Sequence, residues 1–131
     1  MTEAYLDASA ILKLMVEERE SLALVNYLDE RELAISTSVI AEVEIVRSLQ
    51  RLRASRADQD DAMRGIYLLN LDPGVRHEAL RLKPHQLRAL DAIHIATALS
   101  VNDRELEFVT YDERQADAAR QAGLKVVQPG R

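Results

Sequence analysis

The chain has no cysteine and no tryptophan, and its 131 residues include only one phenylalanine, three prolines and four glycines. The absence of cysteine excludes disulfide scaffolds, cysteine-ligated zinc, iron–sulfur clusters and thiol nucleophiles. Scarce glycine and proline, few aromatic residues and frequent leucine and alanine favour a helix-rich fold over a small β-sandwich. Oxygen ligands are therefore the main resource that the sequence offers for chemistry.

Long apolar runs and targeting signals are also missing. No run approaches the roughly 18 apolar residues that a membrane-spanning helix needs. The first seven residues, MTEAYLD, lack the basic and apolar stretches of a signal peptide. We therefore expect a soluble, cytoplasmic protein with a single domain over residues 1–131, a length at which one domain buries a real core.

The charge balance is acidic, with 17 Lys and Arg against 22 Asp and Glu, giving a net charge of −5. Nucleic-acid-binding proteins are usually basic, so this balance argues against a nucleic acid partner. The objection weakens if some acids bind divalent cations. Each ion adds two positive charges, so the net charge of −5 becomes −3 with one ion and −1 with two.

Short strand-like runs alternate with longer helical patterns along the chain. The expected strands cover residues 4–6, 33–36, 67–71, 107–110 and 125–127. Helical spacing of apolar residues is seen in 11–15, 22–28, 38–52, 57–65, 73–82, 90–99 and 112–122. Strands separated by helices indicate an α/β fold with a parallel sheet covered on both faces.

Four acids stand out by their placement, and two of them lie where such a fold binds ligands, outside the carboxyl ends of the strands. Asp7 and Asp112 follow expected strands, whereas Glu42 and Asp91 lie in the first turns of expected helices. Each acid alone could serve as a helix cap or favour a helix dipole. If all four converge, a divalent cation would offset their repulsion, and hard oxygen ligands suit Mg²⁺ or Mn²⁺.

The sequence resembles the PIN-domain ribonucleases of the VapC toxin type over residues 4 to 130. Each matching stretch is short, but their order and spacing are specific. The stretches are Tyr5-Leu6-Asp7-Ala8-Ser9, Ser38-Val39-Ile40-Ala41-Glu42, Asp91-Ala92-Ile93-His94-Ile95-Ala96-Thr97-Ala98 and Val109-Thr110-Tyr111-Asp112.

This resemblance implies a three-layer α/β/α sandwich with a five-stranded parallel sheet, and metal-dependent endoribonuclease activity with Mg²⁺ or Mn²⁺. By position, the catalytic and metal-binding quartet would be Asp7, Glu42, Asp91 and Asp112. Asp7 and Asp91 would be the principal ligands, with Ser9 and Thr110 orienting them. Glu44 falls outside the pattern, because it lies two residues from Glu42 and hence on another face of the helix.

The resemblance also implies partners: a homodimer, an RNA substrate such as tRNA or rRNA, and a VapB-type antitoxin. The antitoxin would enter a groove near the first helices, for which the candidates, with core roles as the alternative, are Ile11, Leu12, Leu14, Met15 and Leu28. Arginines between Arg47 and Arg64 form a solvated surface, or contact the RNA backbone or the antitoxin. His94 is interpreted as a packed histidine and not as a ligand.

Two other readings stay open. A signalling receiver domain is also a small parallel α/β domain, and Asp7, Asp72, Thr110 and Lys125 could be fitted to its pattern. A receiver or a haloacid-dehalogenase phosphatase would need a further acid near Asp7, where this chain has Ala8 and Ser9. The other reading is a PIN-like module that binds a partner without catalysis.

Overall fold

The computed structural model describes residues 3–131 and contains one five-stranded sheet. The strands are β1 (Glu3–Leu6), β2 (Ala34–Ser38), β3 (Ile66–Leu69), β4 (Glu107–Val109) and β5 (Lys125–Val127). They pair in the order β3-β2-β1-β4-β5, and every pair is parallel. Each connection is therefore a crossover, as the alternation of strands and helices predicted.

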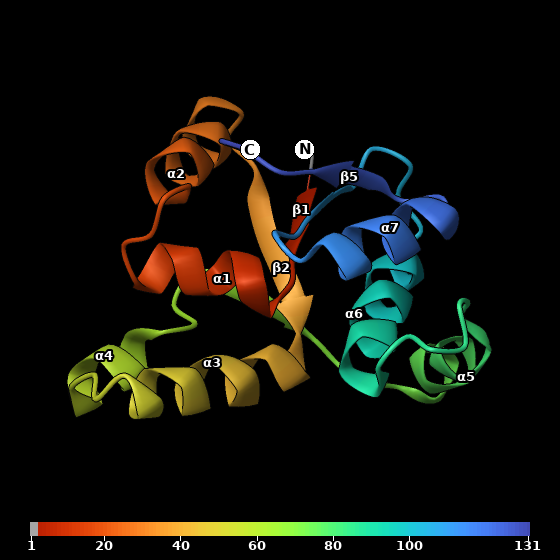
Figure 1. Ribbon diagram of the computed structural model, residues 1–131, viewed down its shortest axis with the longest axis horizontal. Coiled ribbons are helices and arrows are strands. Elements are labelled where there is room, and N and C mark those ends of the chain that lie inside the picture. The colour runs from red at the N-terminus through yellow and green to blue at the C-terminus, as the bar shows by residue number, and fades with distance from the viewer. Residues whose placement is uncertain (1–2) are drawn as a thin grey trace.

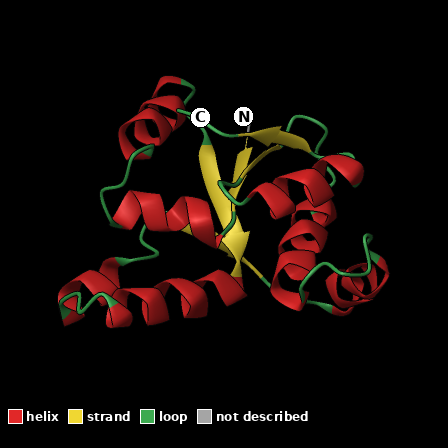
Figure 2. Ribbon diagram, viewed as in Figure 1, coloured by secondary structure: helices red, strands yellow, loops and turns green. Residues whose placement is uncertain are grey.

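Helices cover both faces of this sheet, which confirms the three-layer α/β/α sandwich. They are α1 (Ala8–Met15), α2 (Ser21–Glu30), α3 (Val39–Arg51), α4 (Arg56–Asp61), α5 (Pro73–Arg81), α6 (Ala89–Ser100) and α7 (Glu113–Gln121). Figure 1 shows α1 to α4 on one side of the strands and α5 to α7 on the other, and Figure 2 shows the same layers by type of element. Within residues 3–131, none of the helices combines the length and the apolar character that crossing a membrane requires.

Alternation along the strands divides the interior into two cores. On β1, Ala4 and Leu6 pack with α1, α2 and α3, whereas Tyr5 points to the opposite face with α6 and α7. Val109 and Phe108 on β4 repeat the division, and the rings of Tyr5 and Phe108 stack with centroids 5.4 Å apart. Both faces of the central strands are thus buried, which explains their short apolar sequences.

The carboxyl ends of the strands lead directly into capped helices. Asp7 ends β1 and caps α1, Ser38 ends β2 and caps α3, and Asp112 follows β4 and caps α7. In Figure 1, α1 and α3 leave the ends of β1 and β2 at the centre of the view. Leu6 pairs in register with Val109, so the residues after these two strands are neighbours.

The amino ends of β4 and β5 form a separate ionic cluster at the opposite edge of the sheet. The buried carboxylate of Glu107 lies 2.8 Å from Arg31 Nη1 and 3.0 Å from Lys125 Nζ. A receiver domain would need Lys125 beside Asp7, but the two residues lie at opposite ends of their parallel strands. The receiver interpretation is therefore wrong.

Candidate active site

Asp7 is the most buried acid at the carboxyl edge of the sheet, with 4% of its surface exposed. Its Oδ1 accepts hydrogen bonds from Ser9 Oγ (2.6 Å) and from the backbone N–H of Ala10 (3.1 Å). Its Oδ2 accepts a hydrogen bond of 2.5 Å from Thr110 Oγ1. Burial raises the pKa of the Asp7 carboxyl even though these donors oppose the shift. Ionising this carboxyl in the folded protein therefore costs more free energy than it does in water.

Two further predicted acids, Asp91 and Asp112, belong to the same group of charges as Asp7. Asp91 stands in the first turn of α6, where burial and then the negative charges of Asp112 and Asp7 raise its pKa. The charge of Glu44 contributes to the same shift. Asp112 is exposed, and its Oδ1 caps the first turn of α7. Four carboxylates thus share one electrostatic environment.

The prediction that Glu42, rather than Glu44, faces the other acids is wrong. Glu42 is exposed, whereas Glu44 Oε1 lies 2.8 Å from His94 Nε2 on α6. Residues two positions apart on a helix point roughly 200° apart, so only one of the two acids can face α6. The sequence placed both acids on α3, but which flank meets α6 is decided by packing between distant segments.

His94 holds this arrangement from the interior, and the sequence reasoning missed that role. The ring is 2% exposed, which confirms the packed histidine that the sequence predicted. The Tyr5 hydroxyl lies 2.7 Å from Nδ1, and burial raises the pKa of Tyr5, which keeps the phenol protonated. A Glu44 carboxylate can only accept, so Nε2 donates the hydrogen bond to it. The available signal was the spacing of Asp91 and His94, which puts them on one helix face.

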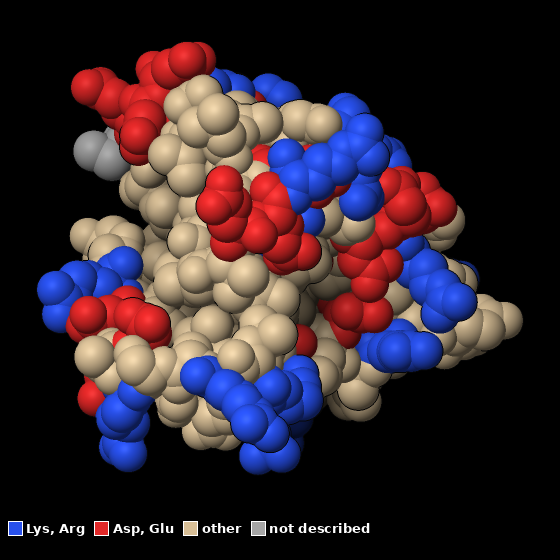
Figure 3. All heavy atoms as spheres, turned by 60° about the vertical axis from the view of Figure 1, so that its left-hand side comes forward, with Lys and Arg blue, Asp and Glu red and all other residues tan. Residues whose placement is uncertain are grey.

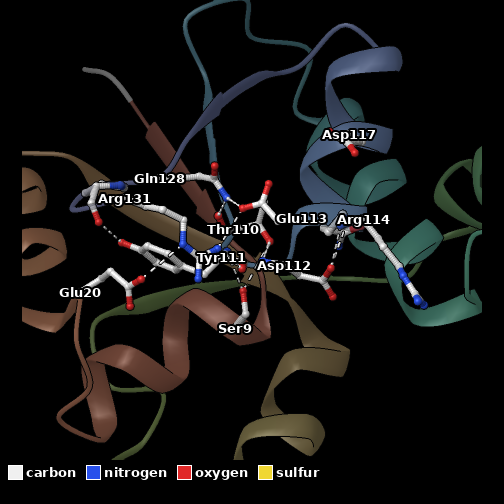
Figure 4. A network of polar contacts seen from close by, with 12 residues as sticks. Ser9, Glu20, Thr110, Tyr111, Asp112, Glu113, Arg114, Asp117, Gln128 and Arg131 are labelled. Atoms are coloured by element: carbon white, nitrogen blue, oxygen red, sulfur yellow. Dashed lines mark hydrogen bonds and ion pairs between the residues drawn. The ribbon is translucent and has the colours of Figure 1, made fainter.

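The loop after β4 is pinned by side chains of the site itself. Ser9 Oγ accepts a hydrogen bond of 2.9 Å from the backbone N–H of Tyr111. Thr110 Oγ1 accepts one of 3.1 Å from the backbone N–H of Asp112. Figure 4 shows these side chains converging beneath the start of α7. Ser9 and Thr110 therefore orient both Asp7 and the loop that carries Asp112.

A second layer of contacts comes from the last residues of the chain. Gln128 Nε2 donates to the carbonyl of Thr110 (3.0 Å), and Arg131 Nη1 donates to that of Tyr111 (2.6 Å). Arg131 also pairs with Glu20, 3.3 Å away, and its guanidinium lies over the Tyr111 ring (Figure 4). These contacts tie β5 and α2 to the loop that carries Asp112.

The donor set fits a hard divalent cation, although its side chains are not arranged around one. Among the residues that the structure describes, no three acidic or histidine side chains surround a common point. Both oxygens of Asp7 and one of Asp112 already accept hydrogen bonds. Yet burial and then the converging charges raise the pKa of Asp91, and a cation would relieve the repulsion between these charges. Carboxylate oxygens without thiolate ligands match Mg²⁺ or Mn²⁺.

The chain is similar in sequence to known proteins along almost its whole length. Residues 4–121 match the family model described as PIN domain. Two curated relatives from Mycobacterium tuberculosis are Ribonuclease VapC46, 41% identical over 98% of this chain and 99% of its own, and Ribonuclease VapC35, 36% identical over 96% of each.

Solved structures share the fold at low sequence identity. The crystal structure of Mycobacterium tuberculosis VapC20, described as a sarcin–ricin loop cleaving toxin, superposes with a TM-score of 0.73 at 16% identity, over 97% of this chain and all of that one. VapBC2 from Rickettsia felis, bound to a DNA fragment from its promoter, also reaches 0.73, at 13% identity over 98% and 99% of the two chains.

Proposed function

Since this chain belongs to the PIN-domain family, as a VapC-type ribonuclease toxin, we propose that it is a metal-dependent endoribonuclease whose activity a cognate antitoxin blocks. The observation that carries the proposal is the gathering of Asp7, Asp91, Asp112 and Glu44 at the carboxyl edge of the sheet. Glu44 takes the role that the sequence alone assigned to Glu42.

Each residue of the site has a distinct part in the proposed reaction. Asp7 and Asp91 would hold Mg²⁺ or Mn²⁺, with Glu44 and Asp112 completing the ligands directly or through water. A bound divalent ion supplies an activated water and stabilises charge on the phosphoryl group. Asp112 Oδ2 accepts no hydrogen bond within residues 3–131, which leaves it free to take a proton from water.

The test is cleavage of end-labelled RNA by Asp7→Asn and Asp91→Asn, each purified exactly as the wild type is. We expect either variant to lose at least about 100-fold in rate, the scale expected when an acid–base or ligand group is removed. Asp60→Asn on exposed α4 is the matched control and should cleave normally. Wild-type rates in both site variants, or full activity in EDTA, would refute the proposal. A protein that binds RNA without cleaving it in any divalent ion would be a binding module.

The proposed antitoxin site is a groove of about 480 Å³ between the ends of α1 and α3 and the helix α4. It is lined by Leu14, Met15, Val16, Leu49, Leu52, Ala54, Asp58 and Asp61. Of the predicted groove residues, Ile11 and Leu28 are instead part of the core. An apolar floor with acidic residues at its rim suits a segment that combines apolar and basic side chains.

Leu52 is the most informative residue of this groove, because its side chain is largely exposed. We expect Leu52→Asp to weaken inhibition by the antitoxin while RNA cleavage by the free toxin stays normal. Equal inhibition of Leu52→Asp and the wild type would place the antitoxin elsewhere.

The homodimer stays a prediction, which the mass measured by light scattering checks.

A further inference from the structure

Two grooves adjoin the acidic centre, one on each side of the first turn of α6. The first, of about 560 Å³, lies between α1 and α3 and includes Leu90. The second, of about 340 Å³, lies between α6 and α7 and includes Asp91. Because Leu90 and Asp91 are consecutive, the two grooves meet where the acids gather. Figure 3 shows acidic side chains around a hollow on this face, with basic side chains beyond them.

The wall of the first groove is one face of α3. Glu44, Arg47, Ser48 and Arg51 line it, and their spacing of three, four and seven residues places them along one stripe. The stripe begins with an acid of the centre and ends with two arginines, which follow one another at about 6 Å along the helix axis. The exposed side chains of Val43 and Leu90 give the groove an apolar lining.

The second groove repeats this arrangement on the other side of the acids. Arg88 immediately precedes α6, and Arg114 lies in the first turn of α7, beside Asp112. In Figure 4 the Arg114 side chain extends away from Asp112, although its backbone N–H donates to that carboxylate. Each groove therefore carries two arginines close to the acidic centre.

These four arginines are all exposed. Arg31, Lys125 and Arg131 are engaged with carboxylates elsewhere in the molecule. Within residues 3–131, by contrast, none of Arg47, Arg51, Arg88 and Arg114 takes part in an ion pair with a carboxylate. Arg51 Nη2 donates to Ser48 Oγ, 2.9 Å away in the same groove. Guanidinium groups that are not paired with a carboxylate are suited to phosphate groups, which they bind with two parallel hydrogen bonds.

We propose that a single strand of RNA lies along both grooves and crosses the acidic centre between them. Phosphates on one side of the scissile bond contact Arg47 and Arg51, and those on the other side contact Arg88 and Arg114. The apolar lining of the first groove suits unpaired bases, which a duplex keeps stacked in its interior. This path rests on the proposed function, because it gives the acids a phosphodiester to act on.

The test measures RNA binding as a function of salt in an Asp7→Asn background, where the proposed function predicts cleavage at least about 100-fold slower than in the wild type. The probe is a fluorescent single-stranded RNA of mixed sequence, followed by anisotropy. One double variant is Arg47→Gln with Arg51→Gln, and the other is Arg88→Gln with Arg114→Gln. The matched control is Arg76→Gln with Arg104→Gln, which removes two exposed arginines outside both grooves.

Each groove variant should weaken binding and flatten the plot of log K against log salt by about 1.4, since each single-strand phosphate contact contributes roughly 0.7 to the slope. The control should keep the parent slope. Parent-like slopes in either groove variant would overturn the path, and equal affinity for a duplex would overturn the single-strand assignment. Loss of antitoxin binding with intact RNA binding would show a protein-contact surface instead. If the Asp7→Asn parent cleaves RNA at the wild-type rate, the proposed function fails, while the slopes still report the path.

Discussion

The hydroxyl oxygen of Tyr5 lies 2.7 Å from Nδ1 of His94, and both side chains are buried. The other ring nitrogen of His94 lies 2.8 Å from Glu44. Tyr5 precedes Asp7 by two residues on the same strand, so β1 carries one acid of the site and fixes a second one through His94. The contacts from Tyr5 through His94 to Glu44 therefore fix the position of Glu44 relative to Asp7, although the two acids come from different elements.

His94 should therefore control how well the site binds its metal. We expect His94→Leu to lower Mn²⁺ affinity by about 10- to 100-fold, the usual effect of removing a group that orients a ligand. His94→Gln, whose amide can still donate to Glu44, should restore part of that affinity. Isothermal titration with Mn²⁺ measures both, and His77→Leu on exposed α5 is the control. Unchanged Mn²⁺ affinity in His94→Leu would leave the histidine with a packing role only.

Glu44 and Glu42 offer a direct comparison, because both lie in the same stretch of α3. We expect Glu44→Gln to lower the rate of RNA cleavage by about 100-fold or more, on the scale of a lost acid–base or ligand group. Glu42→Gln should stay within about twofold of the wild type, since surface changes away from such sites have small effects. Cleavage rates under single-turnover conditions decide between them. The reverse order of effects would return the role to Glu42.

Glu20 should make stability depend on pH in the acid range. Its carboxylate lies 2.9 Å from Lys13 Nζ and 3.3 Å from Arg131 Nε. The hydrogen bond from Lys13 holds the pKa of Glu20 below its usual 4.5. A lowered folded-state pKa adds stability above pH 4.5, and that stability is lost as the pH falls through the lowered value.

The measurement is the thermal midpoint of wild type and Glu20→Gln between neutral and acid pH. We expect the variant to melt lower at pH 7 and the gap to close at acid pH, where wild-type Glu20 is protonated. Exposed Glu17→Gln should match the wild type throughout. A gap that persists unchanged into acid would mean that the lost contact is not ionic.

Features that local sequence determines were predictable, and those that depend on packing between distant segments were not. Three helices are capped directly after strands, by Asp7, Ser38 and Asp112. These residues lie in the short sequence stretches that predicted the site, so local sequence was enough to place them. The choice between Glu44 and Glu42 depends on where α6 packs. The contact of Tyr5 with His94 joins residues 89 positions apart, and no spacing rule reaches that far.

Asp7 should also make stability depend on pH, because burial raises the pKa of its carboxyl above the usual 3.8. With a raised folded-state pKa, the native protein holds its proton longer, so stability falls as the pH rises through that range. Without metal at pH 7, Asp7→Asn should therefore melt at a higher temperature than the wild type. The gap should narrow toward pH 3.8, where the wild-type carboxyl is increasingly protonated.

Adding Mn²⁺ should reverse the order. A ligand at 100 times its dissociation constant stabilises the folded state by about 2.7 kcal/mol, and only the wild type should gain this. Thermal melts in EDTA and in a Mn²⁺ series measure both effects, with Asp60→Asn following the wild type. A wild type that melts higher than Asp7→Asn in EDTA would show that hydrogen bonds to the charged carboxylate outweigh its burial. Equal Mn²⁺ stabilisation of both proteins would remove Asp7 from the metal ligands, because the loss of a ligand weakens the binding of the ion and so reduces the stabilisation that the ion gives.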